Sequence, residues 1–107
     1  MTTHIEFSRR ATKDIRQLDK PTARRIIEVL ERDLAAEPPP DNLDIKQLQG
    51  AAPWLRLRIG THRVLYRPMT PEEISSFADD KTKDDDDGYL VARIVHRRDL
   101  DQAVGTL

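Results

Sequence analysis

The chain has 107 residues, of which 35% are charged, 37% hydrophobic and 5% aromatic, and it contains no cysteine. This length suits one domain with a single aliphatic core and is too short for two. The lack of cysteine excludes disulfides, a thiolate nucleophile and a zinc–thiolate site. No apolar run approaches the roughly 18 residues of a membrane span, and the N-terminus lacks a signal-peptide pattern. We therefore expect a cytoplasmic protein with no membrane partner.

The net charge of −1 hides a strong segregation of charge along the chain. Residues 70–88 hold eight carboxylates against two lysines, a net charge of −6, whereas the rest carries 16 basic and 11 acidic residues, a net charge of +5. A basic body of this kind can attract nucleic acid. The acidic segment either shields that body or is a solvated insertion, and we predict a mostly disordered loop over 70–88.

The first half of the chain predicts a strand followed by two helices. Residues 4–8 form a short predicted strand, and Ser8 can cap a helix that runs to Leu18. Pro21 suits the first turn of a second helix, which must end before the three prolines at 38–40. The apolar positions of the second helix recur at helical spacing, which places them on one face: Ala23, Ile26, Ile27, Leu30 and Leu34.

The second half predicts a sheet. We read residues 41–53 as a loop with one structured stretch at 45–50. Strands are predicted at 54–59, 62–69 and 89–95, the first two joined by a tight turn at Gly60-Thr61, and a short helix or turn at 99–104. The fold class is α+β, an antiparallel sheet packed against an N-terminal helical hairpin in the order strand, helix, helix, strand, strand, strand. Residues 1–107 form one domain, interrupted by the insertion at 70–88.

Basic residues alternate with apolar ones along the predicted strands. If the apolar face of the sheet lies on the core, the opposite face presents basic residues. These are Arg56, Arg58 and Arg63 from the two strands joined at Gly60-Thr61, and Arg93 with His96 or Arg97 from the last strand. Guanidinium groups bind the oxygens of phosphate and carboxylate in pairs. We therefore expect these side chains to lie together and to meet an anionic partner.

Three motifs in this order resemble the RelE/ParE superfamily of bacterial toxins, the toxic halves of type II toxin–antitoxin modules. They are Leu48-Gln-Gly50, the segment WLRLRIGTHRVLY at 54–66, and IVHRRD at 94–99. The resemblance covers residues 4–69 and 89–101. It implies a cognate antitoxin as partner, with operator DNA contacted only through that antitoxin.

The superfamily holds two functional classes. RelE-like toxins cleave mRNA on the ribosome without a metal or other cofactor, whereas ParE-like toxins are implicated in inhibiting DNA gyrase. The leading hypothesis is a RelE-like endoribonuclease whose partners include the ribosome and mRNA. The alternatives are a ParE-like toxin without nuclease activity, and an inactive toxin fold that serves only to bind an antitoxin.

By resemblance, the candidate catalytic residues are Arg56, Arg58, Arg63, His96 and Arg97, and the candidate RNA-binding residues are Arg56, Arg58, Arg93 and Arg98. Each also has a plain structural interpretation. The arginines can form a solvated strand face or internal ion pairs, and His96 can merely orient the end of its strand. A register slip of one residue would exchange Arg97 and Arg98. Nuclease members also place a tyrosine a few residues further on, where this chain has Leu100-Asp101.

Overall fold

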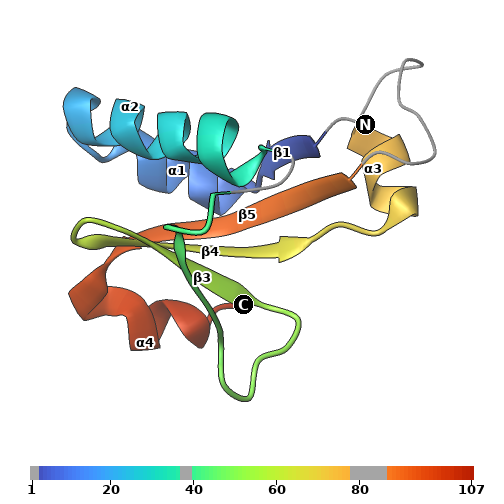
Figure 1. The fold of residues 1–107 in the computed structure, drawn as a ribbon. Helices are drawn as coiled ribbons and strands as arrows, with labels where there is room; N and C mark the ends of the chain where they lie inside the picture. The colour runs from blue at the N-terminus through green and yellow to red at the C-terminus, as the bar shows by residue number, and fades with distance from the viewer. Residues whose placement is uncertain (1–2, 37–39, 78–86) are drawn as a thin grey trace.

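The structure is a computed structural model that describes residues 3–36, 40–77 and 87–107. A five-stranded sheet carries a helical layer on one face, and a short C-terminal helix lies against the other (Figure 1). The elements are, in chain order, β1 (Thr3–Phe7), α1 (Arg9–Arg16), α2 (Lys20–Glu28), the π-helical turn η1 (Val29–Leu34), β2 (Asp44–Gln47), β3 (Leu55–Ile59), β4 (His62–Pro68), α3 (Pro71–Phe77), β5 (Asp87–His96), the 3₁₀ turn η2 (Arg97–Asp99) and α4 (Leu100–Val104). The predicted α+β class is confirmed.

Each helix of the hairpin begins at a capping side chain, and the cap at Ser8 was predicted from the sequence. The Ser8 hydroxyl accepts a hydrogen bond from the N–H of Ala11 at 3.0 Å. The Asp19 carboxylate accepts one from the N–H of Thr22 at 3.1 Å and another from the Thr22 hydroxyl at 2.8 Å. The hydroxyl contact first, and then the N–H contact, lower the pKa of Asp19. Capping satisfies backbone donors that have no partner within the helix.

The core lies between the helical hairpin and the sheet. Ile26, Leu30 and Leu34 are buried from α2 and η1, in agreement with the helical spacing read from the sequence. They belong to one cluster with Leu57 and Val64 of the central strands. A second, smaller cluster forms on the opposite face, where α4 covers Leu65 and Val95 with Ala103. The larger core cluster therefore lies on the hairpin face of the sheet and the smaller one on the opposite face.

The strand order is β1-β5-β4-β3-β2. The prediction of a wholly antiparallel sheet was wrong for β1, which pairs with β5 in parallel, Thr3 opposite Asp87 and Phe7 opposite Val91. These two strands are distant in sequence, so no local sequence pattern specifies their pairing. β2 is an additional edge strand, antiparallel to β3, within the segment 41–53 that we read mainly as a loop.

The prediction of a mostly disordered loop over 70–88 was wrong at the two ends of this segment. Residues 71–77 form α3, and Asp87 and Gly88 begin β5. A reciprocal capping box starts α3: the Glu73 carboxylate accepts from the Thr70 N–H at 3.0 Å, and the Thr70 hydroxyl accepts from the Glu73 N–H at 3.2 Å. The prediction for residues 78–86 lies outside the described residues.

Candidate functional site

Four of the predicted site residues meet on the face of the sheet opposite the helical hairpin. Arg58 of β3 lies directly across from Arg63 of β4 in the register of the two strands. Arg56 lies on the same face two residues before Arg58. The Arg97 backbone N–H donates to the carbonyl of Thr61 at 2.8 Å, which places η2 beside the turn between β3 and β4. We call Arg56, Arg58, Arg63 and Arg97 the arginine cluster.

Arg63 lies within the electrostatic influence of the other three arginines. Burial lowers the pKa of Arg63, and the nearby positive charges of Arg58, Arg56 and Arg97 lower it further. Its guanidinium also donates to the carbonyls of Gly60 at 3.2 Å and His62 at 3.0 Å, which holds it against the turn. Like charges directly opposite on a sheet are destabilising. Asp44 offsets part of this effect on Arg63, and an anionic ligand at the cluster would act in the same direction.

Lys46 is a basic residue of this surface that the sequence reasoning missed. It lies opposite Arg56 in the register of β2 and β3 and is exposed. Asp44 was missed as well. Its carboxylate is 3.7 Å from Nη1 of Arg56 and 4.0 Å from Nη1 of Arg58. Both were overlooked because β2 itself was not predicted, and a strand of four residues leaves little periodicity to detect.

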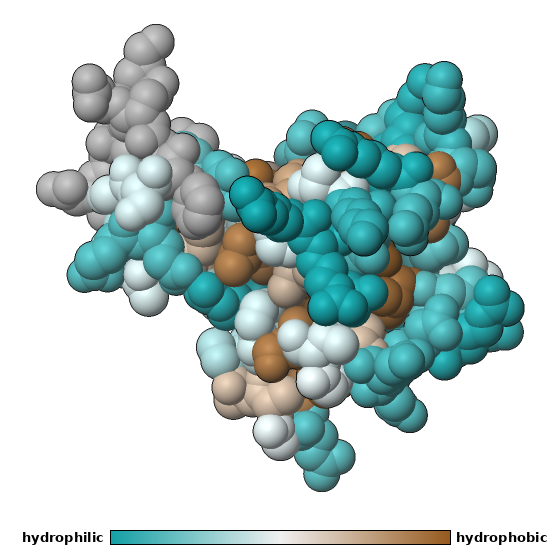
Figure 2. All heavy atoms as spheres, turned by 180° about the vertical axis from the view of Figure 1, so that it is seen from behind, coloured by the Kyte–Doolittle hydropathy of each residue, from teal (hydrophilic) through white to brown (hydrophobic). Residues whose placement is uncertain are grey.

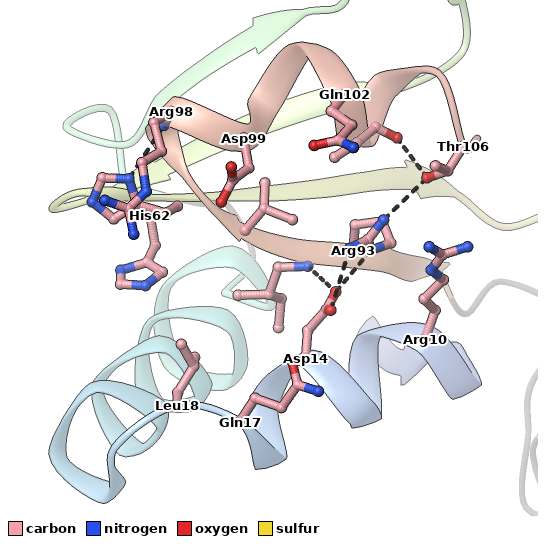
Figure 3. Close-up of a pocket in the computed structure, with 14 residues that line it drawn as sticks. Arg10, Asp14, Gln17, Leu18, His62, Arg93, Arg98, Asp99, Gln102 and Thr106 are labelled. Carbon is pink, nitrogen blue, oxygen red and sulfur yellow. Dashed lines mark hydrogen bonds and ion pairs between the residues drawn. The ribbon is translucent and has the colours of Figure 1, made fainter.

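Arg93 does not join the arginine cluster. Its Nε donates to the Asp14 carboxylate at 2.9 Å and its Nη1 to the Thr106 hydroxyl at 3.1 Å. Figure 3 shows Asp14 pointing from α1 to Arg93 of β5, with Thr106 on the far side of the guanidinium. This pair is largely buried, so we assign Arg93 to the connection between the two layers.

His96 was expected beside the arginines, and the structure places it on the other face of the sheet. It lies opposite His62 in the register, and His62 lies opposite Ile59, which belongs to the core beneath the hairpin. The two imidazole rings stand 5.7 Å apart at 74°. Burial lowers the pKa of His62, and the charge of His96 lowers it further. His96 Nδ1 accepts from the Arg98 N–H at 3.2 Å, so it caps η2.

Arg98 faces a groove separate from the arginine cluster. The groove has a volume of about 580 Å³ and follows β5 between α1 and α4 (Figure 3). Its walls carry charges of both signs, with Arg10 and Arg98 against Asp14 and Asp99. Seen from behind, hydrophobic residues are visible between the hydrophilic helical layer and the hydrophilic lobe that carries α4 (Figure 2). The register ambiguity is thus resolved: Arg97 lies with the arginine cluster, and Arg98 does not.

Trp54 and Arg67 form a further cluster at the end of β4. The Arg67 guanidinium lies 5.6 Å from the centre of the Trp54 ring and donates two hydrogen bonds to Glu73, at 2.8 and 2.7 Å. The hydrogen bonds from Arg67, together with the one from the Thr70 N–H, lower the pKa of Glu73 to about 2. The pair ties α3 to the sheet and neutralises Arg67, which lies on the same face of β4 as Arg63.

Within the described ranges, no three His, Cys, Asp or Glu side chains are grouped so that they could hold a metal ion. A search of the same ranges for a helix both long and apolar enough to cross a membrane found none.

Comparison with known proteins agrees with the fold. Residues 5–101 match the family described as the ParE toxin of the type II toxin–antitoxin system parDE. The chain therefore belongs to the ParE toxin family within the RelE/ParE superfamily, the toxins of type II toxin–antitoxin modules. The comparison with curated proteins gave no significant match.

Solved structures with the same fold come from three prokaryotes. The RelB–RelE antitoxin–toxin complex of Methanococcus jannaschii matches with a TM-score of 0.60 and 18% identity, over 92% of this chain and 96% of that chain. The RelBE2 complex of Mycobacterium tuberculosis gives 0.62 and 24%, over 91% and 100%. The RelE–RelB complex of Pyrococcus horikoshii gives 0.55 and 22%, over 91% and 97%. At these identities the likeness establishes the fold.

Proposed function

We propose that this toxin inhibits translation by binding mRNA on the ribosome through the arginine cluster and cleaving it without a metal ion. The observation that carries the proposal is the cross-strand pair of Arg58 and Arg63, flanked by Arg56 and Arg97. Of the carboxylates in the described part of the chain, only Asp44 lies within 4.0 Å of these guanidinium groups. A surface on which so few carboxylates balance the arginines can bind a polyanion such as RNA.

The arginine cluster supplies the electrostatic part of the reaction. In metal-free RNA cleavage the ribose 2′-oxygen attacks the adjacent phosphorus and loses its proton, and the bond from phosphorus to the 5′-oxygen breaks. The products are a 2′,3′-cyclic phosphate and a 5′-hydroxyl, whose oxygen takes up a proton. Guanidinium forks bind the two non-bridging oxygens and stabilise the charge that builds on them. Arg58 and Arg63 are the pair best placed for this role.

An antitoxin is the second partner that we propose. The three solved structures with this fold are described as complexes of a toxin with its antitoxin. The helical hairpin offers such a partner a basic outer surface, because its exposed residues include Arg9, Lys13, Arg16 and Arg24. Contact with operator DNA would then run through the antitoxin rather than through this chain.

The test is expression without antitoxin, followed by mapping of mRNA ends by primer extension. We expect growth arrest and ribosome-dependent cuts, both reduced roughly 100-fold in Arg63→Ala and in Arg58→Ala. Arg24→Ala, which removes an exposed arginine from the hairpin, is the matched control and should behave as wild type. Growth arrest with intact mRNA would contradict the nuclease proposal.

A ParE-like action on DNA gyrase is the second candidate function. It is favoured by the position of His96, which lies across the sheet from the arginine cluster and caps η2. The tyrosine of nuclease members is also replaced by Leu100-Asp101. A supercoiling assay with purified gyrase separates the two functions: inhibition of supercoiling without mRNA cleavage would establish the second.

A further inference from the structure

Asp44 holds a position that a phosphate group could occupy. Its two carboxylate oxygens point to two different arginines: Oδ1 lies 3.7 Å from Arg56 Nη1, and Oδ2 lies 4.0 Å from Arg58 Nη1. Charge-assisted hydrogen bonds between such groups measure about 2.7–2.9 Å. Asp44 therefore balances charge at this place without bonding closely to either guanidinium.

Arg56 shows the consequence of these long contacts. Its side chain is only 16% exposed, and Nη1 is buried without a hydrogen-bond partner. A buried donor left unsatisfied costs free energy, more so when it is charged. The free protein thus keeps an N–H group that is ready to donate to a better-placed anionic oxygen.

Asp44 and Arg58 are the solvent-accessible members of this group. The Asp44 side chain is 41% exposed and that of Arg58 is 56% exposed. Both residues line an open cavity of about 450 Å³, to which Arg25 contributes a further positive charge and Asp33 a negative one. Arg56 does not line this cavity and its Nη1 is buried, so a phosphate would reach that atom only by taking the place of the Asp44 carboxylate.

We propose that Asp44 is an internal competitor for RNA, and that a phosphodiester displaces its carboxylate to bind between Arg56 and Arg58. This inference rests on the proposed function, because it takes the arginine cluster to be the RNA-binding surface. Asp44 lowers the affinity for any phosphate backbone and partly relieves the repulsion between Arg58 and Arg63 in the free toxin. It is a positioning residue, since it acts only through the two arginines.

The experiment compares Asp44→Asn with Asp41→Asn, which removes the same charge from an exposed residue three positions earlier. A fluorescein-labelled oligouridylate serves as the probe, and its dissociation constant is measured by fluorescence anisotropy over a series of NaCl concentrations. We expect Asp44→Asn to bind roughly two- to tenfold more tightly than wild type. The slope of log K against log salt should steepen by about 0.7 for one added phosphate contact. Asp41→Asn should match wild type.

Failure of this inference can be told apart from failure of the proposed function. If Arg56→Gln and Arg58→Gln weaken binding while Asp44→Asn only equals Asp41→Asn, the competitor role is wrong and the RNA-binding surface stands. If none of the four variants changes the affinity, both ideas fail. Should Asp44→Asn not fold, Asp44→Glu provides the test, because its longer side chain can close onto both guanidinium groups. Asp44→Glu should bind RNA more weakly than wild type, and equal or tighter binding overturns the inference.

Discussion

The Asp14 carboxylate accepts hydrogen bonds from Arg93 Nε and from the backbone N–H of Ile94, each at 2.9 Å. Residues after Val91 in β5 no longer have β1 as a neighbour, so this backbone N–H would otherwise face outward from the sheet. Asp14 thereby joins α1 to β5 just beyond the point where the pairing of β5 with β1 ends. It also protects an exposed strand edge from pairing with another chain. Arg93, which was predicted to bind RNA, thus has a structural role in joining α1 to β5.

Removal of the Asp14 carboxylate should therefore lower the free energy of unfolding. Asp14→Ala leaves the Arg93 guanidinium largely buried without its carboxylate, together with an unsatisfied N–H at Ile94. Breaking a buried ion pair by removing one partner costs about 3–5 kcal/mol, so we expect a loss of that order in the free energy of unfolding. Equilibrium unfolding in urea measures it, with Asp41→Ala as the control for a carboxylate exposed to solvent. A loss equal to that of the control would contradict this role.

The Arg67–Glu73 pair predicts an acid-sensitive stability. The pKa of Glu73 is lowered from its ordinary value of 4.5 to about 2 in the folded protein. Its contribution to stability is therefore present above pH 4.5 and is lost as the pH falls from 4.5 to about 2. Thermal unfolding across this range should show a steeper acid loss for wild type than for Glu73→Gln. Parallel curves for the two proteins would show that the pair adds no pH-dependent stability.

The sequence predicted the parts of the fold that depend on local chemistry. Ile26, Leu30 and Leu34 recur at helical spacing and are buried, and Ser8 caps α1 as its side chain allows. The parallel pairing of β1 with β5 could not be predicted in this way, because it joins Thr3 to Asp87. That contact depends on how the helical hairpin packs, which is a property of the whole chain.

The same limit applies to the candidate site. Alternation along β3 and β4 correctly brings Arg56, Arg58 and Arg63 to one face. It does not identify the partner of Arg93, because Asp14 lies 79 residues away. On β5 a register shift opposite Leu65 and Tyr66 leaves Ala92 without a paired residue on β4. The side chains of β5 therefore do not alternate regularly between the two faces of the sheet. The faces of Arg93 and His96 could therefore not be derived from a simple count along the strand.

His96 should matter more for local structure than for RNA binding. Its Nδ1 accepts from the Arg98 N–H, and it lies on the face away from the arginine cluster. Loss of a side-chain cap costs about 1 kcal/mol, so we expect His96→Ala to lower the free energy of unfolding by that amount. RNA affinity measured at a temperature where the variant remains folded should stay within twofold of wild type. A loss of mRNA cleavage by folded His96→Ala would instead support the prediction that His96 is a catalytic residue.

Arg63 is the residue for which structural and functional roles must be separated most carefully. Its guanidinium donates to the carbonyls of Gly60 and His62, so Arg63→Ala removes both a support of the turn and a charge from the arginine cluster. If the charge binds phosphate, RNA affinity should fall roughly tenfold, and the slope of log K against log salt should decrease by about 0.7. Arg63→Lys retains the charge but not the fork that binds two oxygens, so it should recover the salt slope and only part of the affinity. A purely structural role predicts a different pattern, in which unfolding shifts in both variants while the salt slope stays that of wild type.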